Sequence, residues 1–200
     1  MKKQTPVVGV VLAGGHSRRM GRDKASIVYP GRNQPQWSIV AHLLAQVCGP
    51  VYVSVRKGQV LPVSDAQSCS VLYDEDSYGP LSGILAAMSR HPNHAVLAVA
   101  CDLPLLSEAT LTQLLASRGE QSVTAYRSAH DGLPEPLCAV YEPSFFPILN
   151  EHSAAGRNCP RKILINESAQ VLLLDLAEPN ALDNANTPDD FSRLATHIKT

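Results

Sequence analysis

Apolar and polar residues follow two alternating patterns along the chain. Unbroken apolar runs, typical of strands buried on both faces, occupy Val7–Leu12 and Ala95–Ala100, and a shorter run follows at Val51–Val55. Apolar residues recur at helical spacing over Trp37–Val47, which stops before Gly49-Pro50. The same patterns predict strands at Val71–Tyr73, Val123–Tyr126, Leu137–Tyr141 and Val171–Leu174, and helices at Pro80–Met88, Glu108–Ser117 and Pro188–His197. This alternation predicts an α/β fold, a three-layer α/β/α sandwich around a mostly parallel sheet.

The length and composition of the chain limit its organisation. With 200 residues, of which 44% are hydrophobic, the chain can bury one sizeable core, and we expect a single domain over residues 1–200. Two connections carry no strand or helix pattern, the polar segment Lys57–Ser70 and the loop His130–Pro136.

Charge and cysteine content exclude several classes of function. The net charge is −1 and the basic residues are spread out beyond the first loop, so no nucleic-acid partner is expected. The apolar run after Lys2 and Lys3 is too short for a signal peptide or a membrane span, and we expect no membrane partner and a cytoplasmic protein. The five cysteines are scattered singly and the seven histidines show no ligand spacing, which favours neither a disulfide framework nor a zinc site.

The stretch L-A-G-G-H-S-R-R-M-G-R-D-K, residues 12–24, follows the first predicted strand directly. Gly14 and Gly15 let backbone N–H groups approach an anion, and Arg18, Arg19 and Lys24 supply positive charge that suits a triphosphate. The stretch is not a P-loop, because G-x-x-x-x-G-K-S/T is absent, and it is not a dinucleotide fingerprint, because its glycines are adjacent. The alternative interpretation is an ordinary glycine turn followed by solvated arginines.

Asp102 follows the most apolar predicted strand, in the sequence Cys101-Asp102-Leu103-Pro104. Ligands of open parallel sheets bind beyond the carboxyl ends of the strands, so Asp102 and the loop at Gly14 are expected at the same edge. There Asp102 is predicted to hold Mg²⁺ shared with the phosphates of a nucleotide. The alternative is that Asp102 only forms a turn.

Several motifs resemble, in order and spacing, the nucleotidyltransferases that include molybdenum cofactor guanylyltransferase. They are L-A-G-G-x-S-x-R-M-G-x-D-K from Leu12, Asp74, Gly79-Pro80-Leu81-Ser82-Gly83, Cys101-Asp102-Leu103-Pro104 and Asn184-Ala185-Asn186-Thr187-Pro188. The resemblance implies a Rossmann-like sheet of the nucleotide-diphospho-sugar transferase type. It also implies Mg²⁺-dependent transfer of GMP from GTP to molybdopterin cofactor, with release of pyrophosphate. Molybdoenzymes or other cofactor-biosynthesis proteins are implied as further partners, and a monomer or weak homo-oligomer is expected.

The resemblance also implies a role for each matching residue. Lys24, assisted by Arg18 and Arg19, binds phosphate, and Asp102 holds the metal, so these four form the catalytic set. Asn184 and Asn186 are candidates for the acceptor side, although an Asn-x-Asn-Thr-Pro helix cap explains them almost as well. Asp74 holds the base or ribose, although a strand-ending turn at Asp74–Asp76 is nearly as good an interpretation. The nucleotide-binding set is Leu12, Ala13, Gly14, Gly15, Lys24, Ser54, Asp74, Gly79, Pro80, Leu81 and Asp102.

Three departures from the family pattern leave the substrates open. Ser54 stands where the guanylyltransferases carry an asparagine, which weakens the case for guanine. Pro30–Gln36 is longer than the usual turn, and Asp131–Pro136 is richer in acids and prolines, so both can reshape the acceptor pocket. The alternatives are a cytidylyltransferase acting on the same cofactor, a sugar- or polyol-phosphate nucleotidyltransferase, and a nucleotide-binding partner or chaperone of a molybdoenzyme without turnover.

Overall fold

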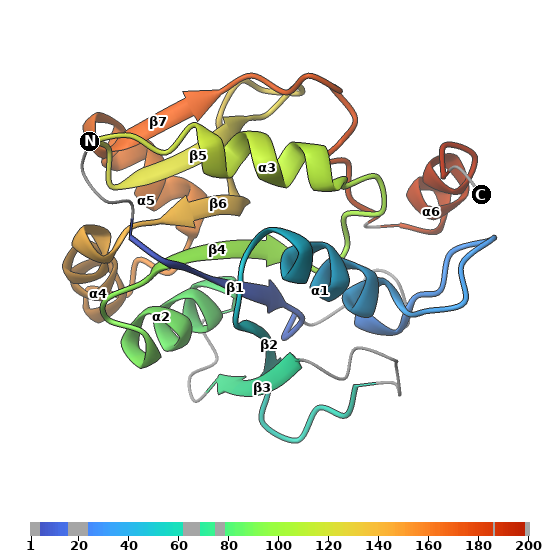
Figure 1. Cartoon of the computed structure of the whole chain (residues 1–200), viewed down its shortest axis with the longest axis horizontal. Coiled ribbons are helices and arrows are strands. Elements are labelled where there is room, and N and C mark those ends of the chain that lie inside the picture. The colour runs from blue at the N-terminus through green and yellow to red at the C-terminus, as the bar shows by residue number, and fades with distance from the viewer. Residues whose placement is uncertain (1–4, 16–23, 62–68, 75–78, 186, 199–200) are drawn as a thin grey trace.

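A twisted seven-stranded sheet forms the central layer of the fold, with the strand order β3-β2-β1-β4-β6-β5-β7 (Figure 1). The structure is a computed structural model that describes residues 5–15, 24–61, 69–74, 79–185 and 187–198. Its strands are β1 (Val7–Leu12), β2 (Val51–Arg56), β3 (Cys69–Asp74), β4 (Ala95–Ala100), β5 (Val123–Arg127), β6 (Pro134–Tyr141) and β7 (Val171–Leu174). Its α-helices are α1 (Gln36–Val47), α2 (Pro80–Arg90), α3 (Glu108–Ala116), α4 (Phe146–Ala154), α5 (Pro160–Asn166) and α6 (Pro188–Ala195), with short 3₁₀ turns at Lys24–Ser26, Pro143–Phe145 and Ser168–Gln170.

The sheet is mostly parallel, as predicted. Only β6 runs antiparallel to its neighbours β4 and β5. β1 pairs in parallel with β2 on one side and with β4 on the other, and Leu12 lies in register with Ser54 and Ala100. After β1, the strands β2 and β3 lie in turn on one side of it, and β4 lies on its other side. The order therefore reverses between β1 and β4, and a ligand site is expected beyond their carboxyl ends.

Helices cover both faces of the sheet, which confirms the three-layer arrangement (Figure 1). Alternate β1 residues divide between the two faces, so Val11 packs with α1 and α3, whereas Val8 and Val10 pack with α2, α4 and α5. Every residue of β4 is buried, as its unbroken apolar run predicted. α6 lies apart, where Leu194 packs against Ile27 and Tyr29, and Phe191 stacks on Tyr29 at 4.8 Å between ring centroids.

Two parts of the prediction need correction. Residues 134–136 were expected in a loop but begin β6, because Pro134 and Glu135 pair with Arg127 and Tyr126 of β5. The two prolines are tolerated there since β4 pairs with β6 only as far as Cys138. Helices α4 and α5 were not predicted. Both are short and have a proline in the first turn, Pro147 in α4 and Pro160 in α5, which obscures the helical spacing.

Candidate active site

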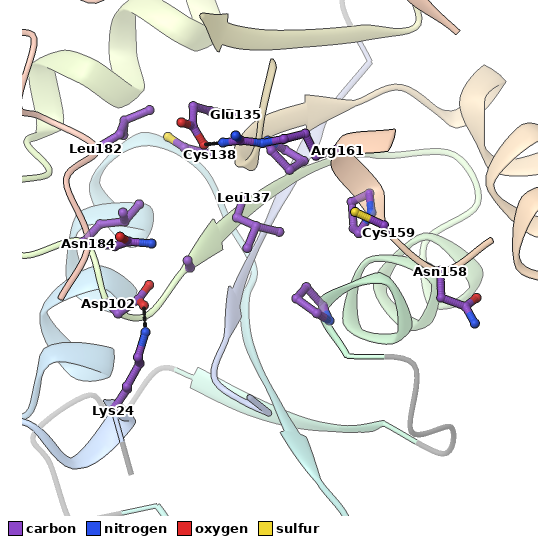
Figure 2. Close-up of a pocket in the computed structure, with 15 residues that line it drawn as sticks. Lys24, Asp102, Glu135, Leu137, Cys138, Asn158, Cys159, Arg161, Leu182 and Asn184 are labelled. Carbon is purple, nitrogen blue, oxygen red and sulfur yellow. Dashed lines mark hydrogen bonds and ion pairs between the residues drawn. The ribbon is translucent and has the colours of Figure 1, made fainter. Parts of the chain in front are cut away.

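Lys24 and Asp102 meet at the carboxyl ends of β1 and β4, where the strand order reverses. The Lys24 Nζ atom donates a hydrogen bond to Asp102 Oδ2 at 2.7 Å (Figure 2). Their side chains are 20% and 13% exposed, so both remain accessible from one side. The two residues are 78 positions apart, and the parallel pairing of β1 with β4 brings them together. The structure thus unites the predicted phosphate-binding lysine and the predicted metal-binding aspartate.

The loop after β1 is tied to the neighbouring strand ends through its first residues. The N–H of Ala13 donates to the Ser54 carbonyl at 2.9 Å, and the Gln59 Nε2 atom donates to the Ala13 carbonyl at 2.9 Å. On the other side, the N–H of Cys101 donates to the Leu12 carbonyl at 3.3 Å. Leu12 and Ala13 are buried, whereas Gly14 is half-buried and Gly15 is exposed. Sequence reasoning missed Gln59, whose amide helps to fix this loop.

Ser54 is a buried residue whose side chain faces helix α2. A Cβ atom at Gly83 would lie 2.4 Å from Ser54 Oγ and 2.7 Å from Leu12 Cδ2, so only a glycine allows α2 to approach β1 and β2 this closely. The carbonyl of Ser54 anchors Ala13, as described above, while its side chain is only 1% exposed. In this arrangement Ser54 holds the start of the glycine loop that follows β1, through the N–H of Ala13.

The predicted turn at Gly79–Leu81 places one residue on the cavity wall and another in the core. Gly79 has φ +69°, a conformation that favours glycine, and it precedes Pro80 at the start of α2. Pro80 lines the cavity beside Asp102, whereas Leu81 is fully buried in the core. Asp74, the last residue of β3, lies in register with Arg56.

A cavity of about 540 Å³ opens beside the Lys24–Asp102 pair (Figure 2). It extends from the end of β4 toward β6 and α5, on the side of Asp102 away from β2. Its wall includes residues that sequence reasoning did not select. They are Ala100, Leu103, Leu137, Cys138, Asn158, Cys159, Pro160, Arg161 and Leu182. The cavity therefore lies on the β6 side of β4, whereas β1, which the glycine loop follows, is the neighbour of β4 on its other side.

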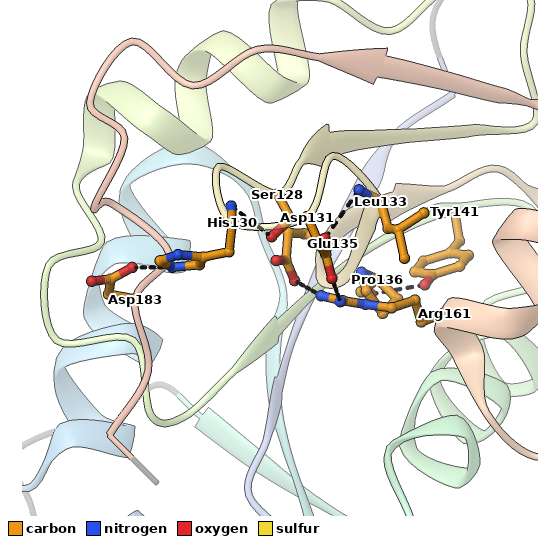
Figure 3. A network of polar contacts seen from close by, with 9 residues as sticks. All are labelled: Ser128, His130, Asp131, Leu133, Glu135, Pro136, Tyr141, Arg161 and Asp183. Atoms are coloured by element: carbon orange, nitrogen blue, oxygen red, sulfur yellow. Dashed lines mark hydrogen bonds and ion pairs between the residues drawn. The ribbon is translucent and has the colours of Figure 1, made fainter. Parts of the chain in front are cut away.

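Arg161, in the first turn of α5, forms the cationic part of the cavity wall. Its Nη1 atom lies 2.9 Å from Asp131 Oδ2 and its Nη2 atom 2.8 Å from Glu135 Oε2 (Figure 3). The pKa of Asp131 is lowered, first by the N–H of Leu133 and then by Arg161. Glu135 and Pro136 of the acid-rich segment 131–136 thus line the cavity, and the two acids orient Arg161.

A second, polar hollow of about 320 Å³ continues from this cavity. The two share Glu135, Arg161, Leu182 and Asn184. The buried carboxylate of Asp183 lies on its wall and contacts His130 Nε2 at 2.9 Å (Figure 3). The same carboxylate accepts a hydrogen bond from Arg193 Nη1 at 2.9 Å. Asp183 therefore fixes the backbone next to Asn184, which lines both spaces.

The cap of α6 is Thr187 and not an asparagine. The Thr187 hydroxyl accepts from the N–H of Asp190 and the Asp190 carboxylate accepts from the N–H of Thr187, which forms a capping box. Asn184 lies before this cap and lines the cavity instead. Arg18, Arg19 and Asn186 lie outside the described residues.

The donor set around Asp102 suits Mg²⁺ better than a metal held by protein alone. Within the described ranges, no three His, Cys, Asp or Glu side chains gather closely enough to form a metal centre. Mg²⁺ usually takes one or two carboxylates, several waters and substrate phosphates, and Asp102 offers one accessible carboxylate at the cavity edge. Among the same residues, no helix has the length and hydropathy of a membrane span.

A mostly parallel sheet with a glycine loop and charged side chains at its switch point is typical of nucleotide-binding α/β proteins, and the family match identifies this chain as a nucleotidyltransferase. Residues 9–171 match the family described as MobA-like NTP transferase domain, and the chain belongs to this family. It is 32% identical over 189 residues to a probable molybdenum cofactor guanylyltransferase of Nostoc sp., covering 93% of this chain and 89% of that protein. A Mycobacterium avium protein with the same description is 32% identical over 200 residues, covering 98% of each.

A longer relative contains this domain as one part. The molybdenum cofactor biosynthesis bifunctional protein of Synechocystis sp. is 36% identical over 197 residues, and the chain spans 54% of its length. Among solved structures, a molybdopterin-guanine dinucleotide biosynthesis protein A from Archaeoglobus fulgidus matches with a TM-score of 0.75 at 23% identity, covering 96% of this chain and 97% of that one. A 2-C-methyl-D-erythritol 4-phosphate cytidylyltransferase from Thermus thermophilus matches at 0.74 and 12% identity, covering 96% and 98%. These structures confirm the fold.

Proposed function

We propose that this nucleotidyltransferase moves GMP from GTP to the terminal phosphate of molybdopterin cofactor, with Mg²⁺, and so forms the guanine dinucleotide cofactor. The single observation that carries this proposal is the Lys24–Asp102 pair, which lines the cavity that contains Arg161 at the switch point between β1 and β4. Two anionic substrates can meet there. Relatives described as guanylyltransferases, at 32% identity over most of the chain, support GTP and molybdopterin as those substrates.

The reaction joins two phosphates, and the chain supplies position and charge. A terminal phosphate oxygen of the acceptor attacks the α-phosphorus of GTP. A new P–O bond forms, the bond to the bridging oxygen breaks, and pyrophosphate leaves with the electron pair. Lys24 offsets negative charge on the phosphates, and Arg161 faces the acceptor side of the same centre. Held by Asp102, Mg²⁺ would neutralise charge on the transferred and leaving phosphates.

One residue of the chain argues against guanine as the base of the nucleotide donor. Ser54 replaces the asparagine of the guanylyltransferase pattern, and its side chain is buried against Gly83. The Ser54 hydroxyl is therefore poorly placed to discriminate between bases. CTP is the second candidate donor for this reason.

Binding of GTP, CTP, ATP and UTP with Mg²⁺, followed by pyrophosphate release on adding molybdopterin cofactor, tests the proposal. We expect selective binding of GTP and release that depends on the acceptor. Preference for CTP would make the protein a cytidylyltransferase. Release only with a sugar or polyol phosphate would overturn the acceptor, and nucleotide binding without release under any condition would favour a partner without turnover.

A further inference from the structure

The turn that carries Asp102 is tethered by two side chains from the segment before α1. The Gln36 Nε2 atom donates to the Leu103 carbonyl at 2.9 Å, and the Arg32 Nη2 atom donates to the Pro104 carbonyl at 2.8 Å. These are the carbonyls of the two residues that directly follow Asp102. Each is held from a segment about seventy positions away, with separations of 67 and 72 residues.

Arg32 and Gln36 form one unit. The Arg32 Nη1 atom donates to Gln36 Oε1 at 2.7 Å, so the guanidinium reaches one carbonyl directly and orients the amide that reaches the other. Gln36 is only 1% exposed, and both ends of its amide are used. Burying an amide is unfavourable unless its hydrogen bonds are made, and a buried polar network specifies a single geometry when it is satisfied.

Gln36 also connects to the segment that carries Lys24. Its backbone N–H donates to the Ile27 carbonyl at 2.7 Å, and the N–H of Ile27 donates to the Lys24 carbonyl at 3.2 Å. The backbone of Gln36 therefore holds one partner of the ion pair, and its side chain holds the other. Two residues of the segment Pro30–Gln36, which is longer than the usual turn of the family, therefore hold the turn at Asp102.

We propose that Arg32 and Gln36 are positioning residues that set the direction of the Asp102 carboxylate, and with it the affinity of the site for the divalent cation. The inference rests on the proposed function, since it concerns the metal that Asp102 would hold. Residues that orient a metal ligand typically change metal affinity or activity by about 10–100-fold when they are replaced. The glycine loop after β1 is held by other contacts, between Ala13 and the residues Ser54 and Gln59, and these contacts do not involve Arg32 or Gln36.

The test measures cation binding apart from turnover. Gln36→Met keeps a side chain of similar length but removes the donor and the acceptor. We expect Mn²⁺, used in place of Mg²⁺ and followed by water proton relaxation with GTP but no acceptor, to bind about 10-fold or more weakly. The Mg²⁺ concentration that gives half-maximal pyrophosphate release should rise by a similar factor. Binding of GTP in EDTA should stay at the wild-type level.

Arg32→Lys provides a second variant in case Gln36→Met fails to fold. Lysine replaces the rigid, planar guanidinium that bonds the Pro104 carbonyl and the Gln36 amide through two different nitrogens with a flexible ammonium, so the Mn²⁺ affinity should again fall. Because the two residues act as one unit, the double variant should lose little more than either single variant.

The matched control is Tyr126→Phe. The Tyr126 hydroxyl donates to the Thr110 carbonyl at 2.7 Å, so this change also removes a buried side-chain donor from a backbone carbonyl, but one in α3 and not in the turn that carries Asp102. It should lower stability and leave Mn²⁺ binding unchanged. If Gln36→Met and Arg32→Lys lose stability as the control does yet keep wild-type Mn²⁺ affinity, the inference is overturned and the tether is structural. Wild-type protein that binds no Mn²⁺ with any nucleotide would instead overturn the proposed function, and this inference with it.

Discussion

At the scale of single residues, the chemistry of the site depends on Lys24. Replacing Lys24 with alanine removes the described cation that lies beside Asp102. A preorganised positive group near developing charge typically contributes about 10²–10³-fold to turnover, so we expect pyrophosphate release by Lys24→Ala to fall by that factor. Turnover with saturating nucleotide and Mg²⁺ measures the effect, and circular dichroism checks the fold.

Arg90→Ala serves as the control for Lys24→Ala. Arg90 is an exposed cation at the end of α2, at the edge of the sheet opposite the site, so this variant matches the loss of one positive charge. Its turnover should equal that of wild type. Equal turnover by Lys24→Ala and Arg90→Ala would remove Lys24 from the mechanism.

At the scale of elements, the close approach of α2 to β1 and β2 depends on Gly83. A Cβ atom there would lie 2.4 Å from Ser54 Oγ and 2.9 Å from Ser54 Cβ. Overpacking of this kind costs about 1–3 kcal/mol, which the better helix propensity of alanine offsets by about 1 kcal/mol. We therefore expect Gly83→Ala to lower the free energy of unfolding in urea, by up to about 2 kcal/mol.

Two further variants decide whether that contact is the cause. Ser54→Ala removes the nearest atom, so the double variant Gly83→Ala, Ser54→Ala should recover part of the loss. Gly119→Ala, whose new Cβ would meet only the end of the flexible Gln121 side chain at 3.3 Å, should stay close to wild type. A Gly83→Ala protein as stable as wild type would show that α2 shifts away without cost.

The elements that the sequence predicted well are those whose pattern is local. The apolar runs of β1 and β4 were predicted with their observed ends, and α3 begins at Glu108 as predicted, where Ser107 caps it by accepting from the N–H of Thr110. The wall of the cavity was not predicted, because Arg161 lies on a short helix whose pattern is weak. The contacts of Gln36 and Gln59 could not be predicted from the sequence either. Their partners are 67 and 46 positions away, and only the folded topology brings them together.

At the scale of the whole molecule, the candidate site and the histidine-containing turn lie at opposite ends of the parallel strands. The candidate site occupies the carboxyl ends of β1 and β4, whereas the turn from α2 into β4 forms the opposite edge and carries His91 and His94. The His91 ring lies 5.0 Å from that of Tyr52 and 5.5 Å from that of His94. Changes at this edge should therefore affect stability without directly affecting the reaction.

The pKa of His91 makes the stability of the molecule depend on pH. Burial lowers this pKa below its ordinary value of 6.5, and the nearby His94 and Arg90 lower it further. The folded protein therefore favours neutral His91, while the unfolded chain takes up a proton near the ordinary value. The contribution of His91 to stability is fully present above pH 6.5 and is lost as the pH falls through the lower, folded pKa.

Melting temperatures measured between about pH 7 and pH 5 test this linkage. His91→Gln cannot be protonated, so its melting temperature should fall less steeply with acid than that of wild type. His42→Gln, an exposed change on α1, should keep the wild-type slope because His42 lies on the other face of the sheet. If His91→Gln and wild type lose stability in parallel, the acid sensitivity arises elsewhere, and the turn between α2 and β4 does not set it.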